Sequence, residues 1–391
     1  MEILATIGAI VACILLFSFA IFIHEFGHFV AARLLGFTVE TFSIGFGPAL
    51  WKKTVGGVEY RISAIPFGGY VALPQLDPEG TKGLQGTSGG EAVGEVAAWK
   101  KIIVAFAGPF GNLVLAVVLA FVLAAVPSVR FGTLPSLVGE VFPDTPAAKA
   151  GMMPGDDVKA INGHAVSSWV DVTTEVQLTG GKTCTFDVVR SGTNVVLSLT
   201  PDRELVSGIY FIGALSTTNM ADAAAWMPAR SPLSQLAWDA GQIVRIIKAL
   251  TTPREAGAAA KAVGGPVMIA EGLYHQVRRN GWDALGFLRF LNVNLAILNL
   301  LPLPVLDGGL IFFALFELLF RRKMNKKFTD IVTQAFMYLL IGLMLFLVWR
   351  DISRSVRIHR AVSRAEAEAA AAGEQKQADG GGAAKEATQG K

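Results

Sequence analysis

The pentapeptide His24-Glu25-Phe26-Gly27-His28 is the part of the sequence best suited to chemistry. Residues four apart on a helix lie one turn apart on the same face, so both imidazoles can reach one metal ion. This spacing is typical of zinc sites in which the glutamate acts on a water molecule. Two histidines that merely pack against a helix are the alternative, but ionisable side chains are costly in an apolar run and are usually functional there. We therefore predict one Zn²⁺ per chain, with His24 and His28 as ligands and Glu25 as the catalytic general base.

A catalytic zinc usually takes three protein ligands and keeps one position for water. Asp307 is the candidate third ligand, because it follows Pro302 and Pro304 in an otherwise apolar run. Prolines there should break a helix, and broken membrane helices occur only where they line a cavity or are buried in protein. Such a break can aim a carboxylate at the metal; the alternative is a helix cap or loop residue. Glu317 is a weaker candidate, which we expect to pair with Arg321 or Arg322.

Two amides lie in the same apolar run as Asp307. Asn294 and Asn299 must find hydrogen-bond partners there. They can bind a substrate backbone or a developing oxyanion, or they can join neighbouring helices. Nearness to Asp307 favours a functional role for Asn299. Gly27, within the zinc pattern, predicts close contact with another helix.

The elements that must position these residues are membrane helices. Hydrophobic residues make up 52% of the 391 positions and charged residues only 17%, against roughly 25% in soluble domains. A helix needs about 20 apolar residues to cross a bilayer, and four runs reach or approach this length. They are Ile3 to Ile23, Ile102 to Val129, Phe290 to Phe320 and Ile331 to Trp349. The third run contains Asp307. A net charge of +3 is too small to indicate nucleic acid as a partner. We predict a multi-pass membrane protein with about four transmembrane helices.

Basic residues indicate the orientation. Arg33, Lys52, Lys53 and Arg61 follow the first run, whose leading end has no Lys or Arg, so we place that side in the cytoplasm. Both termini and the long loop 130 to 285 then lie outside the cytoplasm. Cys13 and Cys184 lie in an apolar and a polar stretch respectively, so we expect no disulfide between them.

Two further regions have a β pattern. Residues 38 to 74 alternate apolar and polar side chains around a Gly56-Gly57 turn, which predicts a small sheet that can accept an extended substrate as an added strand. An ordinary cytoplasmic loop is the alternative. Residues 135 to 215 are polar and β-rich, with turns at Gly155-Asp156 and Ile161-Asn162-Gly163. This second region resembles a bacterial PDZ domain, and only one such unit is visible.

The chain as a whole resembles the site-2 protease family of intramembrane zinc metalloproteases, peptidase M50. The likeness rests on His24-Glu25-Phe26-Gly27-His28 and on Asn299 through Gly309, and it is nearest to the single-PDZ form of the bacterial regulator-of-sigma-E proteases. Smaller matches are Gly45-Phe46-Gly47-Pro48, residues 65 to 71, Ala107-Gly108-Pro109 with Asn112, and Gly265-Pro266.

The resemblance implies particular roles for several residues. It makes His24, His28 and Asp307 the zinc ligands, Glu25 the catalytic carboxylate, and Asn294 and Asn299 substrate-contacting amides. It also associates the loop Gly45-Phe46-Gly47 with substrate handling.

The resulting segments run along the chain in a simple order. We expect a transmembrane helix (1–34), a cytoplasmic or membrane-re-entrant β region (35–99), a second transmembrane helix (100–129), a PDZ domain (130–215), amphipathic membrane-surface helices (216–285), third and fourth transmembrane helices (286–320 and 328–350) and a disordered tail (361–391).

The leading interpretation is a zinc metalloendopeptidase of the bacterial inner membrane, with its active site in the membrane toward the cytoplasmic side. Its expected substrates are single-span membrane proteins, as in the cleavage of anti-sigma factors or signal-peptide remnants. The PDZ domain would lie outside the cytoplasm and would either bind peptide ends or exclude substrates with large outer domains. A membrane zinc transporter and an inactive PDZ scaffold are the alternatives; Glu25 and the PDZ-like region argue against transport, and the complete zinc pattern argues against an inactive scaffold.

Overall fold

The computed structural model describes residues 2–76, 96–126, 134–204, 208–217 and 231–389. These residues form two compact units. The first contains residues 1–135, 218–256 and 268–344, and the second contains residues 136–217, 257–267 and 345–391.

Within the described residues, three helices are long and apolar enough to cross a membrane. They are α1 (Glu2–Leu34), α3 (Ala98–Ala125) and the part of α12 (Lys326–Gln389) that runs from Lys326 to Arg360. These helices match the first, second and fourth predicted spans in place along the chain.

The third predicted span is divided between two helices. α10 (Gly281–Asn299) and α11 (Asp307–Phe320) are separated by a non-helical stretch at residues 300–306, where Pro302 and Pro304 cannot donate helix hydrogen bonds. Gly308 and Gly309, in the first turn of α11, pack against this stretch, and a β-carbon on Gly309 would lie 2.2 Å from the carbonyl oxygen of Leu303. The break therefore places Asp307 at the first position of α11.

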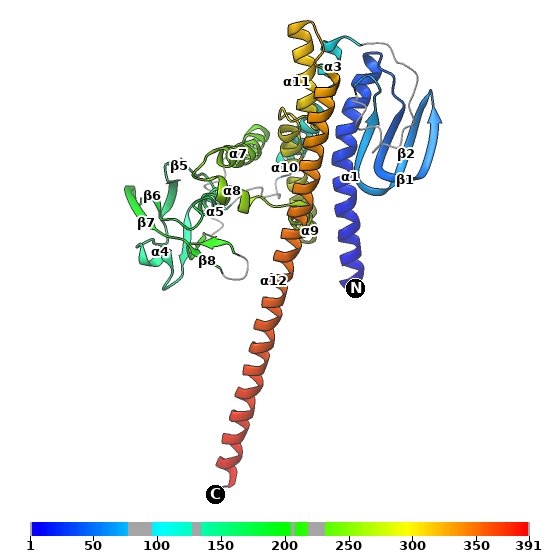
Figure 1. Ribbon diagram of the computed structural model, residues 1–391. Coiled ribbons are helices and arrows are strands. Elements are labelled where there is room, and N and C mark those ends of the chain that lie inside the picture. The colour runs from blue at the N-terminus through cyan, green and yellow to red at the C-terminus, as the bar shows by residue number, and fades with distance from the viewer. Residues whose placement is uncertain (1, 77–95, 127–133, 205–207, 218–230, 390–391) are drawn as a thin grey trace. The chain divides into compact units, whose positions relative to one another are not determined.

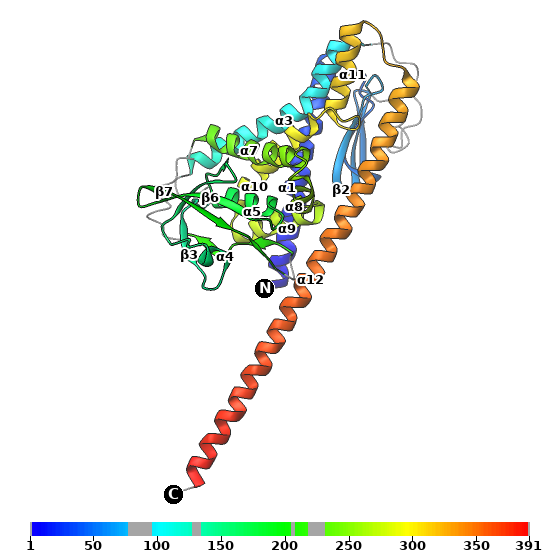
Figure 2. The same cartoon turned by 60° about the vertical axis from the view of Figure 1, so that its left-hand side comes forward.

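Helix α3 is the centre of the first unit, because α1, α10, α11 and α7 (Pro232–Thr251) all contact it. Small residues allow α1 to come close: a β-carbon on Gly27 would lie 2.2 Å from the carbonyl oxygen of Ala107. The close contact predicted for Gly27 is confirmed. Figure 2 shows α11 beside α3 at one end, and α7 and α10 beside it further along.

A small sheet formed by β1 (Thr41–Val55) and β2 (Val58–Ala72) lies beside α1 (Figure 1). Both strands bend, so that residues 41–44 of β1 pair with residues 59–62 of β2 on one side and with residues 69–72 on the other. The turn between the strands is Gly56-Gly57, where both glycines have positive φ. Within the described part of the chain, one edge of the sheet is therefore residues 69–72, at the end of β2. The remainder of the predicted β region, residues 77–95, lies outside the described residues.

In the second unit, residues 136–217 form a β-rich domain, and we use that name below. It contains a four-stranded antiparallel sheet in the order β5-β4-β6-β7 and two two-stranded pairs, β3–β10 and β8–β9. Side chains from the sheet and from α5 pack into one core, with Phe186, Ile161 and Val172 almost fully buried.

The elements of the β-rich domain have the following bounds: β3 (Val138–Val141), α4 (Pro146–Lys149), β4 (Asp157–Ile161), β5 (His164–Ala165), α5 (Trp169–Leu178), β6 (Cys184–Arg190), β7 (Thr193–Leu199), β8 (Asp202–Arg203), β9 (Tyr210–Phe211) and β10 (Ala214–Ser216). The turns expected at Gly155-Asp156 and Ile161-Asn162-Gly163 are present, with positive φ at Gly155, Asn162 and Gly163. Cys13 and Cys184 are both free.

Helices α7, α8 (Ala256–Ala262) and α9 (Pro266–Arg279) occupy the stretch predicted to contain membrane-surface helices. α12 differs from the sequence prediction, because it continues as a helix to Gln389 where a disordered tail was expected from residue 361. Ala is the commonest residue of positions 361–391 and the strongest helix former, although Gly is the second commonest and Gly380, Gly381 and Gly382 do not favour a helix.

Candidate metal centre

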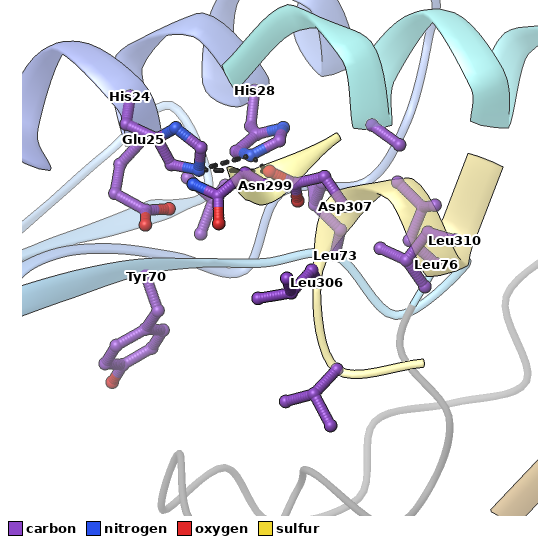
Figure 3. A pocket seen from close by; sticks show the side chains of 13 residues that line it. His24, Glu25, His28, Tyr70, Leu73, Leu76, Asn299, Leu306, Asp307 and Leu310 are labelled. Carbon is purple, nitrogen blue, oxygen red and sulfur yellow. Dashed lines mark hydrogen bonds and ion pairs between the residues drawn. The ribbon is translucent and has the colours of Figure 1, made fainter. Parts of the chain in front are cut away.

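Three side chains from two separate parts of the chain meet at one point: His24, His28 and Asp307. His24 and His28 lie one turn apart on α1, and Asp307 reaches them from the start of α11 (Figure 3). The Nε2 atom of His24 is 3.2 Å from Oδ2 of Asp307, and Nε2 of His28 is 3.4 Å from Oδ1. All three side chains are at most 14% exposed.

These separations fit a bound zinc ion. Ligand atoms about 2.0–2.1 Å from a tetrahedral zinc ion are about 3.3–3.4 Å apart, and the two Nε2 atoms are 3.2 Å apart. Two imidazoles and a carboxylate are also a ligand set that leaves one zinc position open for water or substrate. The residues predicted from the sequence therefore come together in a geometry that fits the metal.

Helix α3 contacts both histidine rings at their Nδ1 atoms. Nδ1 of His28 donates a hydrogen bond of 2.8 Å to the carbonyl oxygen of Val104, which leaves its Nε2 free to bind a metal. Nδ1 of His24 lies 3.2 Å from the side-chain amide of Asn112. Helix α3 thus orients the ligands that α1 provides.

Glu25 lines the same cavity as the three ligands. The cavity has a volume of about 300 Å³, and Tyr70, Val71 and Leu306 are also among its lining residues. The carboxylate of Glu25 accepts a hydrogen bond from the backbone N–H of Val71, in the edge segment of β2. A water molecule in this cavity is therefore within reach of a positioned base.

The structure separates the two predicted amides. Asn299, the last residue of α10, lines the cavity and lies close to the ligand cluster in Figure 3. Asn294 is not among the cavity's lining residues, and its Nδ2 donates to the carbonyl oxygen of Phe290 in its own helix. Its substrate-contacting role stays a prediction. The close-up therefore favours Asn299 over Asn294 as a donor near the reacting bond.

Gly45, Phe46 and Gly47 do not line the cavity. Phe46 lies next to a lining residue, because its ring stacks on that of Tyr70 with ring centroids 6.2 Å apart. Phe46 is 42% exposed. Its place next to a lining residue is consistent with the predicted substrate-handling role, which also stays a prediction.

Sequence reasoning missed Tyr70 and Val71 as individual site residues, although both lie in a stretch that matches the family. The alternating pattern at the end of β2 predicts a strand, but it does not show that the edge of this strand faces the cavity.

The partner expected for Glu317 was wrong. The Nζ atom of Lys101 on α3 lies 2.8 Å from Oε2 of Glu317, where the sequence favoured Arg321 or Arg322. Arg321, at the end of α11, has a left-handed backbone conformation that turns the chain there.

A helical membrane protein with a His-His-Asp cluster and a glutamate in one buried cavity belongs to the class of membrane-embedded metallohydrolases. The model of peptidase family M50 matches residues 12–343, so the chain belongs to that family.

Several relatives extend the match over almost the whole chain. A Campylobacter jejuni protein named as a zinc metalloprotease is 33% identical over 88% of this chain and 93% of its own length. A second, from Synechocystis, is 34% identical over 90% and 95%. Metalloprotease MmpA of Caulobacter vibrioides is 29% identical over 88% and 95%. These matches identify the protein as a zinc metalloendopeptidase of the site-2 protease type.

Among solved structures, the PDZ domain of the SdrC-like protein of Listeria monocytogenes is 20% identical, with a TM-score of 0.20. The match covers 24% of this chain and 97% of that domain.

Proposed function

We propose that this protein hydrolyses peptide bonds inside the transmembrane segments of single-span proteins in the bacterial inner membrane. The observation that carries the proposal is that His24, His28, Asp307 and Glu25 share one cavity, and that the two histidines and Glu25 lie on a helix apolar enough to cross a membrane. A polar site in such a helix is suited to a substrate that itself lies in the membrane.

Each residue has a distinct task in this reaction. His24, His28 and Asp307 would hold the zinc ion, which would supply Lewis acidity and lower the pKa of a water molecule in the cavity. Glu25 takes the proton from that water and returns it to the leaving amine. The Asn299 amide, which lines the cavity, donates to the oxyanion that forms on the attacked carbonyl.

The sheet edge at residues 69–72 supports the handling of a transmembrane substrate. A helix must unwind before water can attack its carbonyls, because its amides and carbonyls are bonded to one another. Among the residues that the structure describes, residues 69–72 pair with β1 on one side only, and Val71 and Tyr70 line the cavity. An unwound substrate that pairs along this edge would lie beside Glu25 as an added strand.

The β-rich domain is the proposed selector of substrates, located outside the cytoplasm. It either binds exposed peptide ends, as PDZ domains do, or excludes substrates with large outer domains. Deletion of residues 136–217 separates these tasks: loss of an excluding domain should permit cleavage of intact long-domain substrates, whereas loss of a binding domain should only slow turnover. The proposed physiological reactions are cleavage of an anti-sigma factor or of signal-peptide remnants.

The proposed mechanism is tested by Glu25→Gln in the purified full-length protein. We expect zinc to stay bound at one ion per chain while cleavage of a truncated single-span substrate falls about 10²- to 10⁴-fold, the usual contribution of a general base. Glu40→Gln is the matched control, because Glu40 precedes β1 and is not among the residues lining the cavity. Cleavage by Glu25→Gln at the wild-type rate would rule out the assigned base.

A further inference from the structure

A fully buried asparagine on α3 is not explained by the reaction described above. Asn112 has no exposed side-chain surface, and its amide lies 3.2 Å from Nδ1 of His24. Its Oδ1 atom has no hydrogen-bond partner among the described residues. A buried amide in a membrane helix is costly unless it has a specific partner.

The approach of α1 to α3 places Asn112 behind His24. A β-carbon on Gly111 would lie 2.8 Å from the carbonyl oxygen of Ile23, so only a residue without a side chain fits at position 111. The two backbones are thereby close enough for the short side chain of Asn112 to reach the imidazole. The ring then lies between the Asn112 amide on one side and Asp307 on the other.

The two ends of the amide match the two neutral forms of His24. Nδ2 can donate to an unprotonated Nδ1, and Oδ1 can accept from a protonated Nδ1. A histidine that binds a metal through Nε2 carries its proton on Nδ1. If the side-chain amide of Asn112 rotates by half a turn, Nδ2 and Oδ1 exchange places with little change of shape. Oδ1 then faces the Nδ1–H group of His24.

We propose that Asn112 is a positioning residue, whose Oδ1 accepts the Nδ1–H of His24 and so directs Nε2 of that ring to the metal. This role parallels that of the Val104 carbonyl, which accepts from Nδ1 of His28 at 2.8 Å. The two acceptors lie about two turns apart on α3, and the two histidines lie one turn apart on α1. Helix α3 thereby fixes both rings in the form that binds zinc.

The proposal rests on His24 being a zinc ligand, as proposed above. Its test is the dissociation constant for zinc of the full-length protein in detergent, measured by competition with a chromophoric chelator. Asn112→Leu removes the acceptor and should raise this constant about 10- to 100-fold, as loss of such an outer partner does in other zinc sites. Asn112→Asp keeps an acceptor of the same shape and should stay within about threefold of the wild type.

Asn292→Leu is the matched control. Asn292 is also fully buried, its Nδ2 donates to the carbonyl oxygen of Leu288 within α10, and it is not among the residues lining the cavity. Its replacement should leave zinc affinity unchanged. Thermal unfolding of the metal-free variants reports separately on stability, which a purely structural role of Asn112 would change without altering zinc affinity.

Three outcomes would overturn the proposal: wild-type zinc affinity in Asn112→Leu, equal weakening in Asn112→Asp and Asn112→Leu, or weakening by Asn112→Leu that persists in a His24→Ala background. If Asn112→Leu does not fold, Asn112→Ala makes the same comparison with a smaller side chain. Wild-type zinc affinity in His24→Ala alone would instead refute the ligand assignment on which the proposal depends, so the two failures are distinguishable.

Discussion

Gly108 of α3 lies directly against the imidazole of His28. A β-carbon at position 108 would fall 2.2 Å from Nε2 of His28, the atom that faces Asp307. Real β-carbon contacts are not this short, so either the ring or the helix must move to admit any side chain. The position of the His28 ring, a candidate zinc ligand, thus requires a residue without a side chain at position 108 of the neighbouring helix.

Gly108→Ala should therefore weaken the metal centre. We expect zinc affinity to fall at least tenfold and turnover about 100-fold, because a displacement of about 1 Å in a catalytic group has effects of that size. Chelator competition and cleavage of a truncated single-span substrate measure the two quantities. Gly8→Ala is the control, since nothing lies within 4 Å of the β-carbon it would add. Unchanged zinc affinity in Gly108→Ala would contradict the close packing of α1 and α3.

The backbone N–H of Val71 is expected to matter more than its side chain. Val71→Pro removes the hydrogen bond to Glu25, and proline is tolerated at sheet edges. Hydrogen bonds to charged groups contribute about 1.5–3 kcal/mol, so turnover should fall about 10- to 100-fold while zinc stays bound.

Val71→Ala supplies the matched control, because it shortens the side chain and keeps the N–H group. It should cleave at close to the wild-type rate. If the alanine variant is as slow as the proline variant, the side chain and not the hydrogen bond to Glu25 is responsible.

The cluster of His24, His28 and Asp307 was predictable because such side chains are rare in apolar sequence. His24 and His28 are spaced for one helix face, and Asp307 follows two prolines that end a helix. Local residue types and spacing therefore predicted both the cluster and the break that positions Asp307. The number of transmembrane helices was harder to predict, because the same break divides the third apolar run into α10 and α11.

Contacts between distant parts of the chain could not be predicted in the same way. The partner of Glu317 is Lys101, 216 positions away, and local spacing favoured Arg321 or Arg322 instead. Asn294 was expected at the site from its apolar surroundings, but that signal does not say which face of α10 it occupies. Only packing shows that Asn299 lines the cavity, whereas Asn294 is bonded within its own helix.

A buried ion pair joins α7 to α10 and should stabilise that contact. Nε and Nη2 of Arg289 lie 2.6 and 3.1 Å from the two carboxylate oxygens of Asp239, and Arg289 also donates to Gln235. Arg289→Met leaves the Asp239 carboxylate buried without its cation, which should destabilise the protein by about 3–5 kcal/mol. Thermal unfolding of the full-length protein in detergent measures the change.

The double variant Arg289→Met with Asp239→Leu should recover most of that stability, because apolar replacement of a whole buried pair is often neutral. If the double variant is as unstable as Arg289→Met, the cost comes from lost packing and not from the unpaired charge.

The β-rich domain contains an ion pair that should make its stability depend on pH. Asp156 has no exposed side-chain surface, and Arg190 donates to its two oxygens at 2.7 and 2.8 Å. Burial opposes ionisation of Asp156, but the hydrogen bonds from Arg190 and from the Met153 N–H, together with the Arg190 charge, outweigh it and lower the pKa of the Asp156 carboxyl. A lowered pKa in the folded state means that the ionised form stabilises the fold.

This contribution should be fully present above the unfolded pKa of about 3.9 and should be lost as pH falls through the lower folded pKa. Asp156→Asn should therefore destabilise the β-rich domain at pH 7 by about 1–3 kcal/mol, and the difference from the wild type should shrink below about pH 4. Urea unfolding of the full-length protein, followed through the fluorescence of Trp169 on α5 after the other six tryptophans are replaced by phenylalanine, measures both effects. A difference that stays constant from pH 7 to pH 3 would show that the ionised carboxylate is not the stabilising form.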